Sequence, residues 1–523
     1  MYIDADTQSL VFKAPDPLMI RDLLSKSRVI NHPDYNIQVK HTLEATKVLR
    51  NVGIEVPGPM IREYNWPGRF TPFDHQYTMA DFYTMHRRCF NLSEMGTGKT
   101  ASTLWAADYL MNTKRIRKVL ILSPLSTMER VWKKNIFEIL MHRSCAVVHG
   151  SRERRLDILN FDVDFYILNH DGVSITDVNR EINHRPDIDL IVVDEGSMFR
   201  NGSTHKYKML RKMLRDDQRV WWITGTPCPT EPTDAWAQAQ IVSPSRVPKF
   251  FGQFRRMTMY NVSQFKWVPR ADGFEHAYNA LQPAIRFLKK DCLDLPSVTE
   301  TERQAKLTDA QVKAFKQMKE VMQAEASTTT ITAVNAADKI NKLRQILCGV
   351  IKDPVSGDYI VIDHHPRAEA LAEVIESASA KVYVMVPFKG IVYALKKFLD
   401  KRWAKTHQWG VEIVNGDVPR KKRDDIFTRF AEEKDPKVLL CHPKVMAHGL
   451  DFTVADVCAL YAPIYSNDEF EQGIERMNRA GQKLPMTIAK IGAHPLDWQI
   501  YKMLDTKRVT QESILKLFNE VIQ

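Results

Sequence analysis

The sequence has no long apolar run and no recognisable leader. Among its 523 residues, no hydrophobic stretch approaches the roughly 18–20 residues that a membrane-spanning helix needs. The first residues, MYIDADTQSLVFK, lack the basic-then-apolar pattern of a secretory signal. We therefore expect no membrane partner and a cytoplasmic location.

Paired cysteines are also missing. The seven cysteines are odd in number and widely scattered, and no CxxC pair occurs. This distribution supports neither a disulfide framework nor structural zinc, and it is typical of a reducing compartment. The adjacent His364 and His365 resemble a ligand pair, but no further ligands follow at metal-binding spacing. Repeats of 20–50 residues and low-complexity tracts are absent as well.

Acidic residues are outnumbered by basic ones. The chain has 63 Asp and Glu against 74 Lys and Arg, which gives a net charge of +11. Such an excess favours a polyanionic partner, although many basic proteins have none. The length is too great for one ordinary core and predicts two to four domains.

Short apolar strands alternate with amphipathic helices in two separate regions. The strands are largely apolar along their length. Those of the first region are KVLILSP, DFYILNH, DLIVVDE and RVWWITG, and those of the second are KVYVMVP, VEIVNG, KVLLCHP and VCALYAP. Strands of this kind are buried on both faces, so the pattern predicts an α/β fold with two parallel sheets covered by helices. The predicted domains are a small N-terminal α/β accessory domain at 1–65, a first lobe at 66–245, a helical insertion and linker at 246–365, a second lobe at 366–495 and a helical tail at 496–523.

The segment NLSEMGTGKTAS, residues 91–102, is similar to a phosphate-binding loop, with Ser93 where the first glycine is expected. Its G-K-T end is intact, so Lys99 should reach the β- and γ-phosphate oxygens and Thr100 should bind Mg²⁺. The first loop position has only to make the turn, which makes the serine tolerable. Because GKT also occurs by chance, this interpretation needs a second element. The nucleotide-binding residues it predicts are Met95, Gly96, Thr97, Gly98, Lys99 and Thr100.

The second element is DLIVVDEGS, an apolar strand that delivers two carboxylates at its carboxyl end. Taken alone, an acidic turn after a strand is common on any surface. Together with the loop, it predicts a nucleotide hydrolase in which Asp194 binds Mg²⁺ and Glu195 orients the attacking water.

Further landmarks occur in a fixed order: VLILSPLSTMERVWKKNI, DEGSMFRN, WWITGTPCPTEPTDAW, NGDVPRKKRDDIFTRF, VMAHGLDFTVAD and EQGIERMNRAGQ. This succession, covering residues 70–485, resembles the helicase superfamily 2 motor and, within it, the Swi/Snf-type DNA translocases. MGTGKT is similar to that family's M-G-x-G-K-T, and QGIERMNRAGQ to its Q-x-x-x-R-x-x-R-x-G-Q. The resemblance implies two RecA-like lobes that hydrolyse ATP with Mg²⁺ and act on DNA.

The resemblance also implies roles for individual residues. Gln76 matches the family's adenine-reading glutamine, although by itself it is more typical of a surface helix start. Arg476 and Arg479 match the arginine fingers that stabilise charge on the transferring phosphoryl group, and Gln472 belongs to the same helical face. As bare residues, two arginines three apart on a helix more often form a solvated face. Thr224, Gly225 and Thr226 match the motif that couples hydrolysis to strand contact, and Gly449, Leu450 and Asp451 match a glycine-containing turn near DNA and nucleotide.

Two departures from the family pattern stand out. Gly196 and Ser197 follow the acidic pair, so the usual histidine that links this loop to the coupling motif is absent, which puts tight coupling in doubt. Asp451 stands where asparagine is frequent. The N-terminal segment IQVKHTLEATKVLRNVGIEVPGP is similar to the segment before the motor in annealing helicases and phage-encoded members, and we expect a bacterial host cytoplasm for such a protein.

Contacts to nucleic acid should fall on phosphates, because such contacts position a motor without reading sequence. In the second lobe, Lys444 and the basic run 420–423 are the best candidates for phosphate contacts, although such a run is more often a solvated helix start. The cluster of Arg152, Arg154 and Arg155 is likewise more typical of a solvated surface. The residues we expect at the nucleic acid are Ser123, Pro124, His170, Arg200, Thr224, Gly225, Thr226 and Lys444.

The leading hypothesis is an ATP-driven translocase on duplex, forked or branched DNA. A strand-separating DNA or RNA helicase is the alternative among enzymes, and it needs a wedge or pin that the sequence does not reveal. A nucleotide-gated DNA clamp with residual hydrolysis is the alternative outside that class, motivated by the missing histidine.

Overall fold

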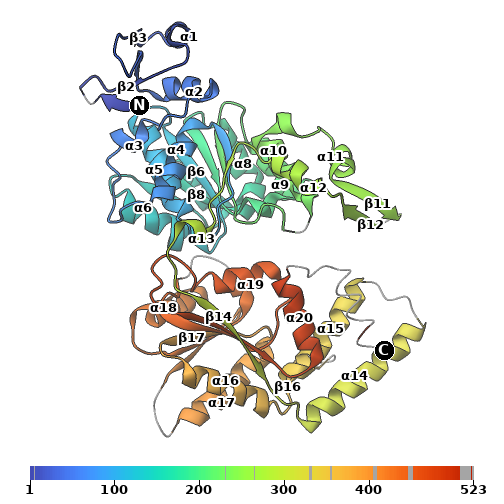
Figure 1. Cartoon of the computed structure of the whole chain (residues 1–523). Helices are drawn as coiled ribbons and strands as arrows, with labels where there is room; N and C mark the ends of the chain where they lie inside the picture. The colour runs from blue at the N-terminus through green and yellow to red at the C-terminus, as the bar shows by residue number, and fades with distance from the viewer. Residues whose placement is uncertain are drawn as a thin grey trace. The chain divides into compact units, whose positions relative to one another are not determined.

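Two parallel sheets organise the chain, each built from the apolar strands of one region (Figure 1). The structure is a computed structural model, and it describes all residues except Ala5, Thr230 and residues 264–265, 329–332, 354–355, 405–408, 446–450, 507–519 and 521–523. The chain divides into two compact units, residues 1–292 and 293–523. The prediction of an α/β fold with two parallel-sheet lobes is therefore confirmed.

The first unit contains a seven-stranded sheet in the order β13-β5-β10-β9-β6-β8-β7, and every pairing in it is parallel. Successive side chains of a strand point to opposite faces, so each strand contributes to two cores. The strands are β5 (Arg88–Asn91), β6 (Lys118–Ser123), β7 (Cys145–Val148), β8 (Phe165–Asn169), β9 (Ile188–Val193), β10 (Arg219–Ile223) and β13 (Ala284–Ile285).

Helices cover both faces of this sheet. Helices α3 to α6 pack on one core and α7 to α12 on the other, as the two buried clusters show. Their bounds are α3 (Met60–Glu63), α4 (Asp74–Met85), α5 (Lys99–Asn112), α6 (Lys134–Ile139), α7 (Arg152–Leu159), α8 (Thr176–His184), α9 (His205–Met213), α10 (Ala235–Val242), α11 (Phe251–Thr258), α12 (Gly273–Ala280) and α13 (Lys289–Cys292). A two-stranded antiparallel hairpin, β11 (Met259–Ser263) with β12 (Lys266–Pro269), follows α11.

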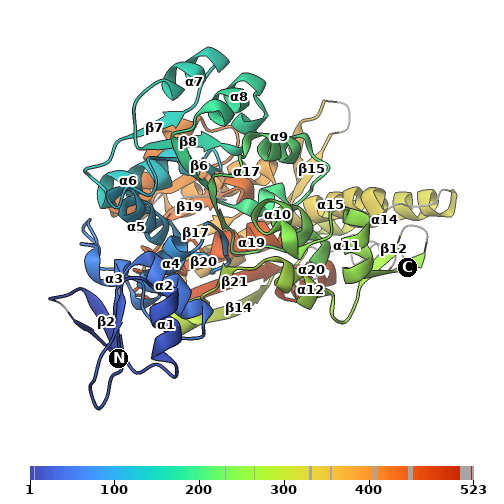
Figure 2. The same ribbon diagram turned by 90° about the horizontal axis from the view of Figure 1, so that it is seen from above.

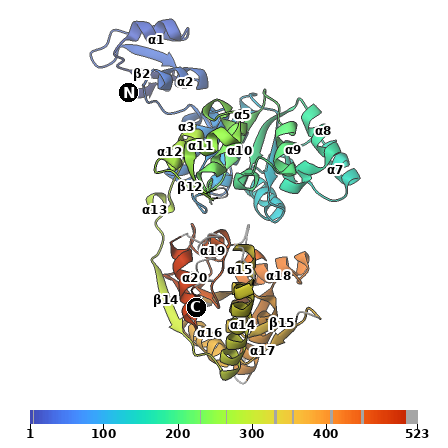
Figure 3. The ribbon, with the colours of Figure 1, turned by 90° about the vertical axis from the view of Figure 1, so that its right-hand side faces the viewer.

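The N-terminal elements form a four-stranded antiparallel sheet in the order β1-β2-β4-β3, with a small core of its own. Figure 3 shows α1, β2 and α2 grouped apart from the helices of the larger sheet. Helix α2 ends where Gly53 takes a positive φ of 81°, and Arg50 on it forms an ion pair with Asp81 of α4 at 2.7 Å. The elements are β1 (Tyr2–Asp4), β2 (Ser9–Phe12), α1 (Pro17–Leu23), β3 (Ser27–Val29), β4 (Ile37–Lys40) and α2 (Leu43–Asn51).

The second unit contains a six-stranded, all-parallel sheet in the order β14-β21-β20-β17-β19-β18; Figure 2 shows β14 beside β21. Helices α16 and α17 pack on one face and α14, α15, α18, α19 and α20 on the other. The strands are β14 (Val298–Gln304), β17 (Lys381–Met385), β18 (Val411–Val414), β19 (Val438–Cys441), β20 (Ala455–Leu460) and β21 (Met486–Gly492), with a hairpin of β15 (Val350–Lys352) and β16 (Tyr359–Val361). The helices are α14 (Asp309–Thr328), α15 (Ala333–Cys348), α16 (His365–Ser377), α17 (Lys389–Trp403), α18 (Arg420–Glu432), α19 (Asn467–Ile474) and α20 (Pro495–Asp505).

The segment expected as a helical insertion, residues 246–365, is divided between the units. Its first part, to Cys292, belongs to the first unit, and the part from Leu293 onward, including α14 and α15, belongs to the second. The five-domain division stays a prediction. Within the described residues, no helix is long and apolar enough to cross a membrane.

Candidate functional site

The loop between β5 and α5 has the backbone of a phosphate-binding loop. Gly96 and Gly98 adopt φ angles of 82° and 79°, which non-glycine side chains rarely tolerate. The Lys99 ammonium donates hydrogen bonds to the carbonyl oxygens of Ser93 (2.7 Å) and Glu94 (2.8 Å). Burial lowers the pKa of Lys99, and the negative charges of Glu195, Asp194 and Glu94 oppose this effect. The lysine and both carboxylates of the acidic loop therefore share one electrostatic environment.

Ser93 does more than make a turn. It is fully buried, its backbone N–H donates to Asn91 Oδ1 at 3.0 Å, and its hydroxyl accepts the backbone N–H of Phe287 at 3.0 Å. The next residue, Glu94, accepts the backbone N–H of Lys289 through Oε2 at 2.8 Å. A glycine at the first loop position would lack the hydroxyl, so the serine supplies a hydrogen bond between this loop and the segment after β13.

The acidic loop begins where β9 ends. Asp194 Oδ2 accepts a hydrogen bond from the indole Nε1 of Trp132 at 2.8 Å, and Oδ1 accepts the backbone N–H of Glu195 at 3.1 Å. Burial raises the pKa of Asp194, while the Trp132 hydrogen bond and the charge of Lys99 lower it. Trp132, on a π-helical turn at Met128–Lys133, was not expected from the sequence, because nothing local in VWKKN marks a partner 62 residues away.

The residues present fit a bound Mg²⁺. Mg²⁺ prefers oxygen ligands, and Thr100 offers a hydroxyl at the start of α5 while Asp194 offers a carboxylate. The Asp194 side chain is buried enough for its pKa to be raised, and a cation beside it would offset that cost.

Gln76 and His75 on α4 lie against the phosphate-binding loop. Gln76 Oε1 accepts the backbone N–H of Phe73 at 3.0 Å, and a Cβ built on Gly98 would stand only 1.8 Å from Gln76 Nε2. His75 Nε2 contacts the carbonyl oxygen of Thr97 at 2.9 Å. The glutamine is therefore placed at the loop, and its reading of adenine stays a prediction.

The coupling turn Thr224–Thr226 also reaches this loop. The backbone N–H of Thr224 donates to the carbonyl oxygen of Asn91 at 3.1 Å, and that of Thr226 to the Thr224 hydroxyl at 3.3 Å. A Cβ on Gly225 would lie 3.6 Å from the Ser93 carbonyl oxygen. The fold thus brings the phosphate-binding loop and the coupling turn, more than a hundred residues apart in sequence, into contact.

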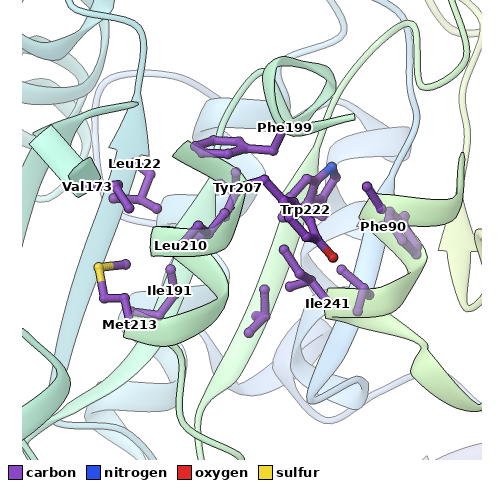
Figure 4. Close-up of a cluster of buried hydrophobic side chains, with 14 of the residues drawn as sticks. Phe90, Leu122, Val173, Ile191, Phe199, Tyr207, Leu210, Met213, Trp222 and Ile241 are labelled. Atoms are coloured by element: carbon purple, nitrogen blue, oxygen red, sulfur yellow. The ribbon is translucent and has the colours of Figure 1, made fainter. Parts of the chain in front are cut away.

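The packing around position 196 explains why the acidic loop contains glycine there. A Cβ on Gly196 would fall 1.9 Å from Trp222 Nε1 and 2.5 Å from Trp222 Cδ1, so the indole occupies that space. The indole donates to Gln238 Oε1 at 2.9 Å and lies edge to face with Phe199, with ring centroids 6.0 Å apart (Figure 4). Trp222 precedes Thr224 by two residues, so the packing of its indole against Gly196 links the acidic loop to the coupling turn. In the family pattern the missing histidine makes this link.

We expect Gly196→Ala to disturb this link. Overpacking a filled site costs about 1–3 kcal/mol, so the free energy of unfolding should fall by that amount in urea titrations. DNA-stimulated ATP hydrolysis should fall more than basal hydrolysis. In a Trp222→Leu background the same substitution should cost less, because the clashing ring is gone. Gly252→Ala is the matched control, since a Cβ there meets nothing within 4 Å; equal effects of the two substitutions would contradict the packing argument.

His170 is bound to the acidic loop. It is buried, its Nε2 contacts the carbonyl oxygen of Asp194 at 2.8 Å, and its ring lies edge to face with Phe199 at 5.1 Å. A carbonyl oxygen only accepts, so Nε2 carries the proton. Burial lowers the pKa of His170 to about 4, while the hydrogen bond to Asp194 opposes the shift.

This shift predicts a pH dependence of stability. Because the folded pKa lies below the usual 6.5, the unfolded chain binds a proton first as the pH falls from 6.5 toward 4, and stability is lost over that window. Between pH 7 and pH 5, His170 should account for about 2 kcal/mol of lost unfolding free energy. Urea titrations at the two pH values, compared with His170→Gln, measure it. Equal losses in the two proteins would contradict the assignment.

The other residues expected at nucleic acid differ in exposure. Ser123, Pro124 and His170 are buried at the ends of β6 and β8, whereas the Arg200 side chain is 37% exposed beside Ser197 and Asp234. Lys444 is exposed on the second unit. Their contacts with nucleic acid stay predictions.

The arginines of the second unit lie beyond the helix on which we expected them. Helix α19 contains Gln472 but ends at Ile474, so Arg476 and Arg479 follow it in turns and do not share its face. Arg476 is buried, and Arg479 Nε lies 3.8 Å from Asp451 Oδ2. Gly449 and Leu450 lie outside the described residues.

A cavity of about 650 Å³ opens at the carboxyl ends of β17, β19 and β20 in the second unit. Lys444 lines it together with Lys389 and Arg344, neither of which was expected from the sequence. The Arg344 guanidinium lies 4.1 Å from the ring centre of Tyr465 and 5.2 Å from that of Phe388. Arg344 itself lies on α15, a hundred residues before Lys444 in the sequence.

A family model described as "SNF2-related domain" matches residues 77–350, more than half of the chain, and one described as "Helicase conserved C-terminal domain" matches residues 366–481. The chain is 24% identical to "Putative protein p41" of Acyrthosiphon pisum secondary endosymbiont phage 1, covering 86% of this chain and 98% of that protein.

Longer relatives match over part of their length. The chain is 22% identical to "ATP-dependent DNA helicase DDM1" of Arabidopsis thaliana, covering 79% of this chain and 57% of that protein. It is 23% identical to "DNA annealing helicase and endonuclease ZRANB3" of Mus musculus, covering 83% of this chain and 40% of that protein. Among solved structures, "Sulfolobus solfataricus SWI2/SNF2 ATPase core in complex with dsDNA" matches with a TM-score of 0.41 and 19% identity, covering 87% of this chain and 96% of that one.

Proposed function

The chain belongs to the SNF2-related family of ATP-dependent helicase-type ATPases, and from that premise we propose that it is an ATP-driven translocase on double-stranded DNA. The family resemblance drawn from the order of its motifs is thereby confirmed. We propose further that it moves along duplex DNA and remodels forked or branched DNA in replication, recombination or repair.

The contact between the phosphate-binding loop and the coupling turn carries this proposal. Gly225 lies against the Ser93 carbonyl, and Trp222 fills the space beside Gly196, so both nucleotide-binding loops touch the strand that ends in the coupling turn. A rearrangement of either loop on nucleotide binding or hydrolysis would therefore shift the coupling turn Thr224–Thr226. Simple nucleotide binding needs no such packing, whereas a motor does.

The residues of the first unit suit ATP hydrolysis. In the proposed cycle Lys99 leaves the Ser93 and Glu94 carbonyls to bind phosphate oxygens, while Glu195 orients water and accepts its proton. Thr100 and Asp194 would hold Mg²⁺, which when bound neutralises charge on the phosphate oxygens. Arg476 and Arg479 would stabilise the charge that develops on the transferring group. Gln76 would read adenine, and Gln472, Gly449 and Asp451 would support the site.

DNA would be held through its phosphates. Lys444, Lys389 and Arg344 line the cavity of the second unit beside the carboxylates Asp338 and Glu469. Arg200 adds an exposed guanidinium on the first unit. Each side chain that neutralises a phosphate makes binding more salt-dependent without specifying a base. The N-terminal sheet domain is proposed to recognise DNA structure.

One experiment separates the candidate functions. Steady-state ATP hydrolysis is measured without nucleic acid and with single-stranded DNA, duplex DNA, forked DNA or duplex RNA at one salt concentration. Strong stimulation by duplex or forked DNA supports the translocase. Stimulation by RNA or single strands alone favours a strand-separating helicase, and none at all favours a nucleotide-gated clamp. A Lys99→Ala protein that still displaces a triplex-forming strand in ATP contradicts the motor.

A further inference from the structure

A hairpin on the first unit carries exposed groups that the proposed motor does not use. Strands β11 and β12 extend from helix α11 beyond the seven-stranded sheet (Figure 1). We call the exposed and half-buried residues of α11, of the turn before it and of the two strands the hairpin surface. Its main members are the exposed Lys249, Phe250, Arg256 and Tyr260 and the half-buried Arg255 and Trp267.

Positive charge on this surface is not neutralised. From Ala235 to Ala271 the sequence has no Asp or Glu but six Lys and Arg residues. Among the described residues, Lys249, Arg255 and Arg256 form no ion pair with a carboxylate, whereas arginines such as Arg117, Arg143 and Arg185 of the same unit do. A cationic region without internal counter-charges suits a polyanionic ligand.

Apolar and aromatic side chains are exposed between these charges. Phe250 is 64% exposed, Tyr260 46% and Val262 54%. The ribbon is only two strands wide, and Met259 at the start of β11 is fully buried, so the buried methionine and not the exposed rings attaches the ribbon to the unit. The Arg255 guanidinium lies 4.1 Å from the centre of the Trp267 ring, which fixes both planar groups.

We propose that the hairpin surface binds a single-stranded nucleic-acid segment, with phosphates on Lys249 and Arg256 and bases stacked on Tyr260 and Phe250. Duplex DNA offers phosphates and groove edges but keeps the faces of its bases stacked inside, so the exposed rings have no partner there. Unpaired bases present those faces. The inference rests on the proposed function, because a motor that acts at forks or junctions meets such strands.

The test uses the full chain and fluorescence anisotropy with labelled oligo(dT), oligo(U) of equal length and a blunt duplex of equal length. Tyr260→Ala should weaken oligonucleotide binding by about 5- to 100-fold, since one stacked base is lost. Tyr260→Phe keeps the ring and should bind as the unchanged protein does. Lys249→Ala with Arg256→Ala should reduce the slope of log affinity against log salt by about 1.4. Phe161→Ala and Lys208→Ala, exposed elsewhere on the unit, are matched controls.

The affinity for the blunt duplex should change by less than about twofold in every hairpin variant. If a variant lost as much affinity for the duplex as for the oligonucleotides, the assignment to single strands would be overturned. Oligonucleotide binding by Tyr260→Ala that matches the Phe161→Ala control would overturn the proposal altogether, as would a Tyr260→Phe protein as weak as Tyr260→Ala. Stronger binding of oligo(dT) than oligo(U), or the reverse, supports the surface and identifies DNA or RNA as its ligand. Duplex-stimulated ATP hydrolysis of the unchanged protein tests the translocase separately, so either proposal can fail alone.

Discussion

Glu195→Gln should lower kcat for ATP hydrolysis by about 10²- to 10⁴-fold, the range that a positioned general base contributes. Glu195 is the second residue after the end of β9, its φ of 49° turns the chain sharply, and its charge acts on Lys99. Glutamine keeps the size and hydrogen-bonding reach of the side chain but cannot accept the proton of the attacking water. Nucleotide affinity should change little, because no phosphate contact is removed.

Single-turnover hydrolysis and titration with a fluorescent ATP analogue separate chemistry from binding. Glu55→Gln, an exposed substitution of the same type in the first unit, serves as the control and should leave both quantities unchanged. A Glu195→Gln protein whose kcat stays within about tenfold of the unchanged protein would place the general base elsewhere.

Arg479→Ala should lower kcat by about 10³-fold or more, the range that an arginine finger contributes to phosphoryl transfer. The side chain is 32% exposed, whereas that of Arg476 is buried, so Arg479 is the more accessible of the two guanidinium groups. Arg479→Lys should not restore the rate, because an ammonium cannot offer the planar fork of the guanidinium.

Asp451→Asn tests whether Arg479 matters for hydrolysis through its ion pair within the second unit or through the phosphoryl group. That substitution removes the partner 3.8 Å from Arg479 Nε, and an exposed pair of this kind contributes about 0.2–1 kcal/mol. The kcat should then change by less than about fivefold. If Asp451→Asn lowers kcat as far as Arg479→Ala does, loss of the ion pair with Asp451 accounts for the effect of Arg479→Ala. The prediction that Arg479 acts on the phosphoryl group would then be wrong.

The structure changes the meaning of two departures noted in the sequence. Ser93 was judged tolerable because its position needs only a turn, yet its hydroxyl bonds Phe287, 194 residues away. The missing histidine put coupling in doubt, yet Gly196 leaves room for Trp222, whose strand ends at the coupling turn. In both places the residue is explained by a neighbour that is distant along the chain.

What the sequence by itself determined was local. Apolar strands such as KVLILS predicted two parallel sheets, and Gly96, Gly98 and Lys99 predicted the phosphate-binding loop, because strand burial and positive φ are dictated by residues within a few positions. The motif order then predicted the family. Only the tertiary structure decided that Trp132 bonds Asp194, that α19 ends before Arg476 and that the boundary between the compact units follows Cys292. Contacts of that kind depend on how strands and helices pack over long sequence separations, and no local pattern encodes them.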